Sequence, residues 1–400
     1  MPKKTVEDIE VKGKRVLLRA DFNVPLNIKT GDISDDSRIR ASLPTIKYLV
    51  DHKSRIILCS HLGRPGGNVV ENLRMAPIAQ RLSQLMGVPV STVSDCIGQQ
   101  VESKVETLKE GDILVLENLR FHPEEEANDA DFAGKLASLA DIYVNDAFGT
   151  AHRAHASTVG VAKYLPAVAG FLMKKELEMM KKLLHDSARP LVCLIGGAKV
   201  SDKIELLQNM LRKIDVLLVG GGMAAPFLKT QGYEVGRSLI ENDKLGLAKK
   251  LLQEAQEWRV PFLLPIDVVV AEEIKAGAPT RIVPTTDIPS GSHIVDIGPQ
   301  SIELFCSELK KCRTIMWNGP MGIYEIPQFA QGTRSIASFL STLNATTIIG
   351  GGSSAEVVQE MGLTDKMTHV STGGGASLRF LEGVALPGVE ILLDSGDFVG

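Results

Sequence analysis

LVCLIGGAK (Leu191–Lys199) is an apolar run that ends at glycines, and the second half of the chain repeats this arrangement three times. The other three runs are VLLVGGG (Val216–Gly222), TIIGGG (Thr347–Gly352) and HVSTGGG (His369–Gly375). A buried strand that turns through glycines into a helix exposes backbone N–H groups at the positive end of that helix, where a phosphate can bind. Four such turns in one region predict strands whose carboxyl ends meet around a polyphosphate.

The rest of the chain also alternates short apolar runs with helical patterns, which predicts an α/β fold with mainly parallel sheets. In the first half the expected strands are Arg15–Arg19, Arg55–Ser60, Asp112–Leu116 and Asp141–Asn145. Helices are expected over Ala76–Met86, stopped by Gly87, and over Asp131–Leu139, capped by Asn128 or Asp129.

A third helix is expected over Leu172–Leu184, where apolar residues recur at helical spacing and Glu178 lies four positions before Lys182. This helix would connect two lobes. The predicted organisation is therefore an N-terminal lobe over residues 1–170, a connecting helix over 171–185 and a C-terminal lobe over 186–383.

Length, charge and cysteine content narrow the class of protein. The chain has 400 residues and a net charge of −4, which favours several domains and argues against nucleic-acid binding. No apolar signal core follows the N-terminus, and the most hydrophobic region, Val260–Ala271, is broken by prolines and too short to span a bilayer. Five cysteines without a C-x-x-C pair predict reduced thiols in a cytoplasmic protein, not disulfides or a zinc site.

Arginines follow the predicted strands of the first half. Because ligands of open parallel sheets bind at the carboxyl ends of the strands, Arg64, Arg120 and Arg153 are expected to face one crevice. Arg38, which follows a cap-like Asp35–Ser37, is expected to join them. Guanidinium groups bind carboxylates and phosphates through two parallel hydrogen bonds, so the cluster predicts an anion site, although any single arginine could equally be a solvated surface residue.

Other polar residues at these strand ends refine the expected ligand. Asp21 and Asn23 can bind hydroxyl groups, and together with the arginines they favour a small polyanion that carries a hydroxyl. The histidines His61, His152 and His155 are as consistent with hydrogen-bonded structural roles as with ligand contacts.

The first glycine turn of the second half also carries lysines. In Gly196–Lys203, Lys199 and Lys203 are four positions apart, so both are expected on one face of a helix start, beside the phosphate. A solvated surface role fits Lys203 better than Lys199. The segment is not a Walker A loop.

Two segments, Gly220–Ala225 and Gly350–Ala355, match the G-x-G-x-x-A pattern of dinucleotide sites. An NAD-dependent oxidoreductase is therefore an alternative, but it requires an acidic residue at the end of the next strand. Glu241 and Asp243 lie near that distance within a polar, helix-like stretch, which weakens this alternative.

A fifth expected strand ends in TIMWNGPMGIYE (Thr314–Glu325). Asn318 and Glu325 are candidates for contacts with a ribose or a base. Trp317 and Tyr324 are expected to pack in the core.

Several of these segments together resemble the phosphoglycerate kinase family. The resemblance runs from about Asp8 to Val389 in family order, and seven motifs carry it: RVLLRADFNVP (Arg15–Pro25), SHLGRP (Ser60–Pro65), ENLRFHPEEE (Glu117–Glu126), NDAFGTAHRAH (Asn145–His155), GGAKVSDK (Gly196–Lys203), WNGPMG (Trp317–Gly322) and STGGGAS (Ser371–Ser377).

The resemblance implies two Rossmann-like lobes with mainly parallel sheets, joined by the connecting helix, and a tail over residues 384–400 that packs back on the N-terminal lobe. It implies that the N-terminal lobe binds 3-phosphoglycerate or 1,3-bisphosphoglycerate through Asp21, Asn23, Arg38, His61, Arg64, Arg120 and Arg153. It implies a Mg²⁺-ADP or Mg²⁺-ATP site in the C-terminal lobe, at Gly196, Ala198, Lys199, Lys203, Gly221, Gly222, Gly298, Asn318, Glu325, Gly350, Gly351, Gly352, Ser353 and Ser354. Gly373–Gly375 would meet the transferring phosphoryl group.

Two positions depart from the family pattern. Ser353 stands where the family usually has an aspartate that helps to hold the metal, and serine is a poorer ligand for a hard cation. Mg²⁺ would then be held mainly by phosphates and water. Arg379 stands where the family commonly has glutamate, and we interpret it as a surface change.

The implied reaction passes a phosphoryl group between an acyl phosphate and ADP, and neither reacting group carries a proton that a base must remove. Catalysis is therefore expected to rest on positioning, charge neutralisation and closure of the lobes. Arg38, Lys199, Gly352 and Gly375 are the expected catalytic residues in a monomeric enzyme. A nucleotide-binding regulator that has lost the chemistry is a second alternative, supported only by Ser353.

Overall fold

The computed structural model describes residues 2–27 and 30–397 and divides into two compact units. The first unit runs to Glu178 and takes up the chain again at Ala385, and the second comprises Met179–Val384. No helix in the described part of the chain is long and apolar enough to cross a membrane. The α/β class expected from the sequence is confirmed, because each unit is built around a six-stranded parallel sheet.

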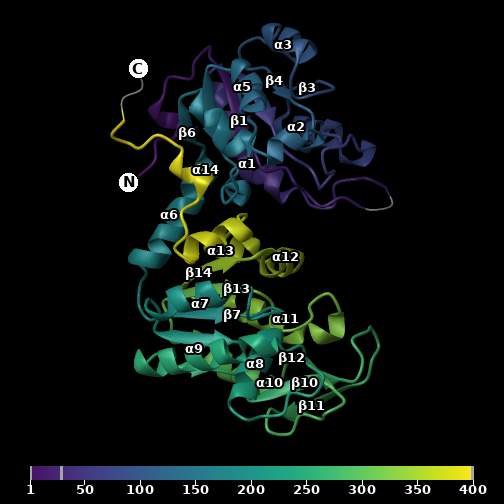
Figure 1. The fold of residues 1–400 in the computed structure, drawn as a ribbon, viewed down its shortest axis with the longest axis vertical. Coiled ribbons are helices and arrows are strands. Elements are labelled where there is room, and N and C mark those ends of the chain that lie inside the picture. Colours follow the sequence, from purple (N-terminus) through teal and green to yellow (C-terminus); the bar gives the residue numbers. More distant parts are fainter. Residues whose placement is uncertain (1, 28–29, 398–400) are drawn as a thin grey trace. The chain divides into compact units, whose positions relative to one another are not determined.

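The sheet of the first unit has the strand order β3-β4-β2-β1-β5-β6, with all neighbours parallel. Its strands are β1 (Arg15–Arg19), β2 (Arg55–Cys59), β3 (Val90–Thr92), β4 (Ile113–Val115), β5 (Ile142–Asn145) and β6 (Ala167–Ala169). Its helices are α1 (Ser37–Asp51), α2 (Ala76–Met86), α3 (Gln99–Glu106), α4 (Pro123–Glu126), α5 (Ala130–Ser138) and α14 (Pro387–Glu390). All of these except α4 are labelled in Figure 1.

Apolar side chains cover both faces of this sheet. Val16 and Leu18 pack into one core cluster with α1 and α2, while the alternate residue Leu17 is fully buried on the opposite face. Strands buried on both faces read as continuous apolar runs, which explains why RVLLR and RIILC stood out in the sequence.

The predicted helices of the first half are confirmed, with small shifts at their ends. Helix α2 ends before Gly87, whose φ of 69° requires the left-handed region that glycine adopts at low cost. Helix α5 is capped by Asp129, whose side chain accepts the N–H of Phe132. The expected helix over Leu172–Leu184 is α6 (Phe171–His185).

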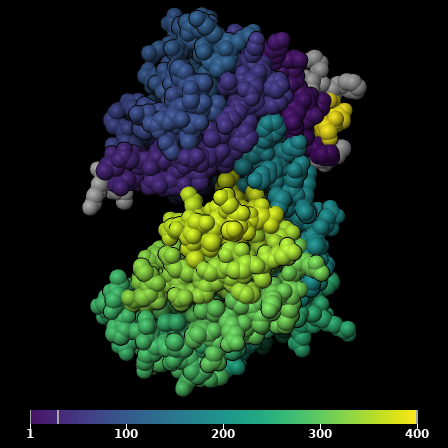
Figure 2. All heavy atoms as spheres, turned by 180° about the vertical axis from the view of Figure 1, so that it is seen from behind, coloured from purple at the N-terminus to yellow at the C-terminus, as the bar shows by residue number. Residues whose placement is uncertain are grey.

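The two ends of the chain are tied together on the first unit. Lys3 forms an ion pair with Asp394 at 3.0 Å, and the N–H of Leu393 donates to the carbonyl of Ala167. Asn145 Nδ2 also donates to the carbonyl of Gly388 at 3.0 Å. Figures 1 and 2 show the N-terminal segment in purple beside the tail in yellow.

The parallel sheet of the second unit has the order β15-β14-β13-β7-β8-β9. Its strands are β7 (Leu191–Ile195), β8 (Val216–Val219), β9 (Phe262–Leu263), β13 (Thr314–Asn318), β14 (Thr346–Gly350) and β15 (His369–Val370). Its helices are α7 (Ile204–Leu211), α8 (Ala224–Thr230), α9 (Leu245–Glu257), α10 (Pro299–Leu309), α11 (Gln331–Leu340), α12 (Gly352–Glu360) and α13 (Gly375–Leu381).

The second unit also contains an antiparallel sheet that the sequence analysis did not predict. Its order is β11-β10-β12, with β10 (Asp267–Ala271) between β11 (Thr280–Pro284) and β12 (His293–Ile297). The apolar region Val260–Ala271 thus supplies the edge strand β9 to one sheet and the central strand β10 to the other. An apolar run that prolines interrupt can form one irregular strand or two separate strands. Only the hydrogen-bonded pairing with other strands distinguishes these two possibilities.

Candidate functional site

The strand order reverses at β1 in the first unit, because β2 lies on one side of it and β5 on the other. Ligands of open parallel sheets bind at the carboxyl ends of the strands next to such a reversal. At this edge Arg19 is the last residue of β1, Asp21 and Asn23 follow it, and His61 follows β2. The predicted anion site is therefore expected at this edge of the sheet.

Asp21 and Arg38 form an ion pair at this edge. Burial of Asp21 would raise the pKa of its carboxyl group, but the positive charges of Arg38 and Arg19 outweigh that effect and lower it. Arg38 lies in the first turn of α1, and 32% of its side chain remains exposed. The pair thus holds a guanidinium in a defined orientation with part of its surface open to a ligand.

Arg19 is almost fully buried and was not singled out from the sequence. Its Nη2 lies 3.3 Å from Nδ1 of His61, and its Nε donates to Ser157 Oγ at 2.8 Å. Burial lowers the pKa of His61 well below its usual range, so the ring is neutral at neutral pH. Arginine can only donate, so Nδ1 of His61 accepts and Nε2 carries the proton. The sequence did contain one sign of this role, because Arg19 is a charged residue at the end of the apolar run RVLLR.

Asn118, which the sequence analysis also missed, joins two loops of this edge. Its side-chain amide donates to the carbonyls of Leu62 and Leu73, at 2.8 and 2.9 Å. Its oxygen accepts the N–H groups of Leu62 and Arg120, at 3.2 and 3.1 Å. Asn118 is fully buried, so it fixes the backbone of the turn that carries Arg120.

The loop at Gly63 is held by two of the predicted residues. Asn23 Oδ1 accepts the N–H of Gly63 at 2.8 Å, and Arg120 Nη1 donates to its carbonyl at 2.9 Å. Arg120 also pairs with Glu126 at 3.1 Å. Arg64 follows on this loop with an exposed side chain, for which the described part of the chain shows no ion pair.

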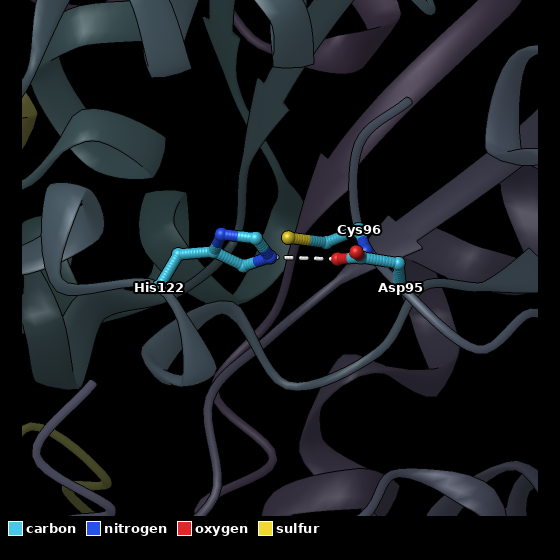
Figure 3. Close-up of side chains that lie close together, drawn as sticks. All are labelled: Asp95, Cys96 and His122. Carbon is cyan, nitrogen blue, oxygen red and sulfur yellow. Dashed lines mark hydrogen bonds and ion pairs between the residues drawn. The ribbon is translucent and has the colours of Figure 1, made fainter. Parts of the chain in front are cut away.

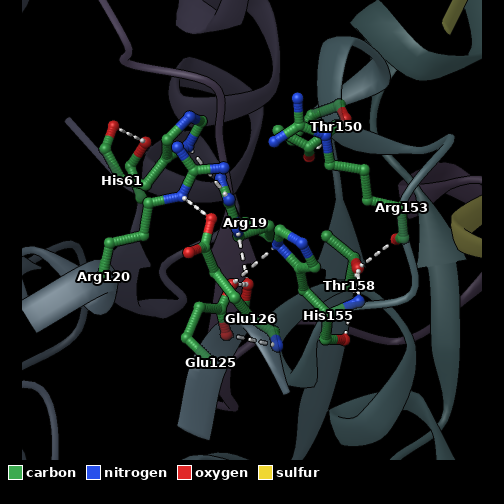
Figure 4. Close-up of polar contacts among 12 residues, drawn as sticks. Arg19, His61, Arg120, Glu125, Glu126, Thr150, Arg153, His155 and Thr158 are labelled. Atoms are coloured by element: carbon green, nitrogen blue, oxygen red, sulfur yellow. Dashed lines mark hydrogen bonds and ion pairs between the residues drawn. The ribbon is translucent and has the colours of Figure 1, made fainter. Parts of the chain in front are cut away.

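A buried carboxylate, Glu125, lies beneath the histidines of this edge (Figure 4). It accepts the backbone N–H and the hydroxyl of Ser157, at 2.9 and 2.6 Å, and lies 3.8 Å from His155 Nδ1. Burial lowers the pKa of His155 to about 4, with help from Arg120 and Arg19, so His155 is neutral. Glu125 was not predicted, because the second of three consecutive glutamates in PEEE gives no sign of burial.

Arg153 lies on the same side of this cluster as Thr150 (Figure 4). Its Nε lies 3.2 Å from Nε2 of His152, which therefore accepts. Its charge is one of the causes that lower the pKa of Arg120, after burial itself. Arg19, Arg38, Arg120 and Arg153 thus surround two neutral histidines, and this charge distribution suits a small polyanion.

The second unit reverses its strand order at β7, between β8 and β13. The turn after β7 is held by the loop after β13: the N–H of Gly196 donates to Asn318, and that of Gly197 donates to Pro320, both at 3.0 Å. The N–H of Met223 donates to Gly197 at 3.0 Å. Three strand exits therefore share one backbone hydrogen-bond network.

Several glycines here allow backbone segments to approach each other. A Cβ at Gly196 would lie 2.1 Å from the carbonyl oxygen of Pro320, and one at Gly221 would lie 2.8 Å from the same atom. A Cβ at Gly222 would lie 2.9 Å from the carbonyl oxygen of Ala198. A Cβ at Gly298 would meet the buried carboxylate of Asp267. At these positions glycine is required by packing.

The prediction for the two lysines was wrong in two respects. Residues 197–203 form turns, and α7 begins only at Ile204, so Lys199 and Lys203 do not share a helix face. Lys203 is the buried one: its Nζ donates to the carbonyls of Gly196 and Asn318, at 2.7 and 3.0 Å. Burial lowers the pKa of Lys203 to about 8. Lys199 is exposed. Spacing cannot show which of two lysines turns inward.

The third and fourth glycine turns are more open than the first two. Gly351 caps α12 with a φ of 83°, and a Cβ at Gly352 would meet nothing within 4 Å. Gly374 caps α13 with a φ of 49° and has equally open surroundings. Strands β14 and β15 are neighbours, so the N-terminal ends of α12 and α13 follow adjacent strand exits. Helix N-termini with open surroundings are places where an anion can bind.

Asn318 and Ser354 line the inner side of this edge. The amide nitrogen of Asn318 is buried without a hydrogen-bond partner, and it would lie 3.1 Å from a Cβ at Gly350. Ser354 Oγ accepts the N–H of Gly319 at 2.7 Å. Ser354 therefore has a structural role, while Asn318 retains a donor that a ligand could use.

Ser353, where the family pattern has aspartate, forms a hydrogen bond with Tyr324. The Tyr324 hydroxyl also donates to Glu356 at 2.8 Å. Tyr324 is thus a partly exposed polar contact, and its predicted packing in the core was wrong, whereas Trp317 is fully buried as predicted. Glu325 is exposed.

Glu241 accepts the N–H of Ser201 at 3.0 Å and also its hydroxyl. It precedes a short helical turn over Asn242–Lys244, and it does not end a strand. The acidic residue that a dinucleotide site needs is therefore missing at this position. Arg379 is half exposed and pairs with Glu205 and Glu382, which confirms its interpretation as a surface residue.

Comparison with known proteins agrees with this geometry. The family model for phosphoglycerate kinase matches residues 6–384. Phosphoglycerate kinases of Dictyoglomus turgidum and Pelotomaculum thermopropionicum are 58% and 56% identical to the chain, each covering 98% of it and 100% of the relative. A solved phosphoglycerate kinase from Coxiella burnetii has a TM-score of 0.85 at 40% identity, and one from Pyrococcus horikoshii has 0.86 at 33%. Each of these two alignments covers 98% of this chain and 98% of the solved chain.

Proposed function

The chain belongs to the phosphoglycerate kinase family and is a glycolytic phosphotransferase with a carboxyl group as acceptor, and we propose how its two units divide that reaction. This membership overturns the oxidoreductase alternative.

The first unit binds 3-phosphoglycerate or 1,3-bisphosphoglycerate through the residues predicted from the sequence. They are Asp21, Asn23, Arg38, His61, Arg64, Arg120 and Arg153. The single observation that carries this assignment is the Asp21–Arg38 ion pair among three further arginines at the sheet reversal. The arginines bind the anionic groups, and His61, which is neutral with Nε2–H as its donor, can bind a hydroxyl or a phosphate oxygen.

The second unit binds ADP or ATP at the carboxyl edge of its sheet. The N–H groups at Gly350–Ser354 and Gly373–Gly375 bind phosphate oxygens, and Asn318 supplies its unpaired amide. The turns beside them contain Gly196, Ala198, Lys199, Gly221 and Gly222. Lys203 stabilises the first of these turns through its hydrogen bond to the carbonyl of Gly196. Gly298 and Glu325 complete the expected set.

The turn that contains Ser353 does not offer the ligands that would hold a Mg²⁺ ion directly on the protein. Mg²⁺ prefers carboxylate and phosphate oxygens, and this turn offers only a hydroxyl that is hydrogen-bonded to Tyr324. We therefore propose that Mg²⁺ arrives with the nucleotide and is held by phosphate oxygens and water. No step of the mechanism is assigned to a protein–metal bond.

Transfer needs no general base, because the attacking oxygen belongs to an ionised carboxylate or phosphate. Arg38 and Lys199 neutralise the charge that develops on the transferring group, and the N–H groups at Gly352 and Gly375 assist them. Reacting atoms must come within about 3–3.5 Å, so substrates bound on separate units require those units to close during turnover.

One coupled assay tests the proposal. Untagged protein supplied with 1,3-bisphosphoglycerate and ADP should form ATP, and omission of either substrate should abolish the signal. Tight nucleotide binding without ATP formation would instead support the regulator alternative. We propose a monomeric, cytoplasmic enzyme, in line with its five unpaired cysteines, and gel filtration with light scattering checks the monomer.

A further inference from the structure

Three side chains of metal-binding type meet in the first unit, and the mechanism uses none of them. They are Asp95, Cys96 and His122 (Figure 3). One potential ligand atom from each, a carboxylate oxygen, a thiol sulfur and a ring nitrogen, lies within 4.8 Å of the other two. Asp95 and Cys96 follow β3, and His122 follows the short helical turn Leu119–Phe121.

Two of the three side chains are partly open to solvent and the third is buried. His122 Nε2 lies 2.7 Å from Asp95 Oδ1, and these side chains are 26% and 47% exposed. Cys96 is fully buried, and its sulfur lies beside that hydrogen bond in Figure 3. An ion could therefore reach the carboxylate and the imidazole from solvent, while the thiol forms the floor of the site.

The backbone holds the three groups in place before any ion binds. Asp95 Oδ1 accepts the N–H of Cys96 at 2.6 Å, and the carbonyl of Asp95 accepts the N–H of Glu117. The N–H of His122 donates to the carbonyl of Leu119, and its ring lies 5.3 Å from that of Phe132. Ligands on short, tied segments lose little conformational entropy on binding.

We propose that Asp95, Cys96 and His122 form a site for Zn²⁺ or a similar borderline-soft divalent ion, with water as the fourth ligand. A thiolate, an imidazole and a carboxylate are the ligand types that Zn²⁺ takes. Mg²⁺ and Ca²⁺ require oxygen ligands and do not bind thiolates well, so the site is distinct from the Mg²⁺ of the nucleotide.

The proton and the charges that metal binding involves are accounted for by the three ligands and the solvent. The thiol of Cys96 releases its proton to solvent as the sulfur–zinc bond forms. The thiolate and the Asp95 carboxylate then offset both charges of the ion. Nitrogen and oxygen ligands at about 2.0–2.1 Å from a tetrahedral ion lie roughly 3.3–3.4 Å apart, so the two atoms of the 2.7 Å His122–Asp95 hydrogen bond must separate by about 0.6 Å.

Co²⁺ is a suitable probe, because a cobalt–thiolate bond produces a charge-transfer absorption that oxygen and nitrogen ligands do not. Untagged full-length protein, freed of metals with a chelator, is titrated with Co²⁺ in the absence of nucleotide. We expect saturation at one ion per chain with thiolate absorption. Zn²⁺ should displace the Co²⁺, and a large excess of Mg²⁺ should not.

Four variants identify the ligands. Cys96→Ser should lose the thiolate absorption, while His122→Gln and Asp95→Asn should weaken binding at least about tenfold. Cys306→Ser is the matched control, because Cys306 is a partly exposed thiol elsewhere in the chain. It should behave like the unmodified protein.

The proposal fails if the absorption persists in Cys96→Ser, or if the unmodified protein shows no saturable binding. It also fails if His122→Gln and Asp95→Asn both bind Co²⁺ normally. Those two replacements lie at partly exposed positions, so they decide the question even if Cys96→Ser does not fold. Circular dichroism establishes that each variant is folded.

Discussion

The two units present different parts of the chain at the edges of similar parallel sheets. In the first unit the strand ends carry charged side chains, held by buried partners such as Asp21, Asn118 and Glu125. In the second unit they carry glycines, two turns of which begin helices in open surroundings. Where charged side chains bind the ligand, binding depends on the partners that hold each charge in place. Where backbone N–H groups bind it, binding depends on close approach to the backbone, which an added Cβ would obstruct. Each kind of site should therefore fail in its own way when mutated.

Arg38→Ala should have the largest effect on turnover. Loss of one preorganised charge is expected to lower kcat by at least about 10²-fold, and because buried Asp21 loses its ion-pair partner the melting temperature should also fall. Steady-state kinetics measure this in the ATP-forming direction. Arg40→Ala is the matched control, since Arg40 lies on the same helix with a largely exposed side chain that pairs with Asp36. A rise in KM at unchanged kcat would show that Arg38 merely binds substrate.

Lys199→Ala and Lys203→Met should separate catalysis from structure within one turn. Lys199 is exposed, so its loss should lower kcat by about 10²-fold and leave stability unchanged. Loss of Lys203 removes the side-chain donor to the carbonyl of Gly196 and one of two donors to that of Asn318, which should cost about 1–3 kcal/mol of the free energy of unfolding. Kinetics and chemical denaturation measure the two effects. A near-normal rate in Lys199→Ala would refute its catalytic role.

Gly221→Ala and Gly352→Ala test whether the glycine turns differ in kind. Gly221 has a φ of 64° and its Cβ would collide with Pro320, so alanine should destabilise the protein by about 1–3 kcal/mol. Gly352 has open surroundings at the start of a helix, so alanine should leave stability unchanged. It should weaken ADP binding by about tenfold, because a Cβ would stand where phosphate approaches. Equal losses of stability would contradict the distinction.

Ser353→Asp should have a smaller effect, on the metal-linked part of nucleotide binding. A carboxylate is a better Mg²⁺ ligand than a hydroxyl, so we expect a severalfold tighter Mg²⁺-ADP complex. Calorimetry across a Mg²⁺ titration measures it, with Ser353→Ala as an uncharged control. Unchanged affinity at every Mg²⁺ concentration would show that position 353 does not contact the metal or its waters.

Lys203 should also make the stability of the protein depend on pH, an effect that lies above pH 8 and leaves turnover at neutral pH unchanged. Its pKa is about 8 in the folded protein, against an ordinary value of 10.5. Between these values the unfolded chain binds more protons, so the contribution of Lys203 to stability rises with pH through this window. Chemical denaturation at several pH values should show this rise in the unmodified protein and not in Lys203→Met. The same slope in both would exclude Lys203 as its source.

Much of the fold was predictable because its signals are local. Helix α2 and its Gly87 stop follow from periodicity and one glycine within a few residues. The antiparallel sheet was missed because strand β10 pairs with β11 and β12, and the pairing of separated segments leaves no mark on the spacing of any one of them. Tyr324 was misassigned for a related reason, since its polar partner Glu356 lies on another element.

The sequence by itself determined the α/β class, the strand ends that carry arginines or glycines, and membership of the phosphoglycerate kinase family. These features depend on residue type and local order. Only the tertiary structure decided that Lys203 is buried and Lys199 exposed, that Gly221 is crowded and Gly352 open, and that Cys96 lies beside His122. Burial and collision depend on which distant segments pack together, and similar glycine clusters in a sequence can meet different neighbours once the chain has folded.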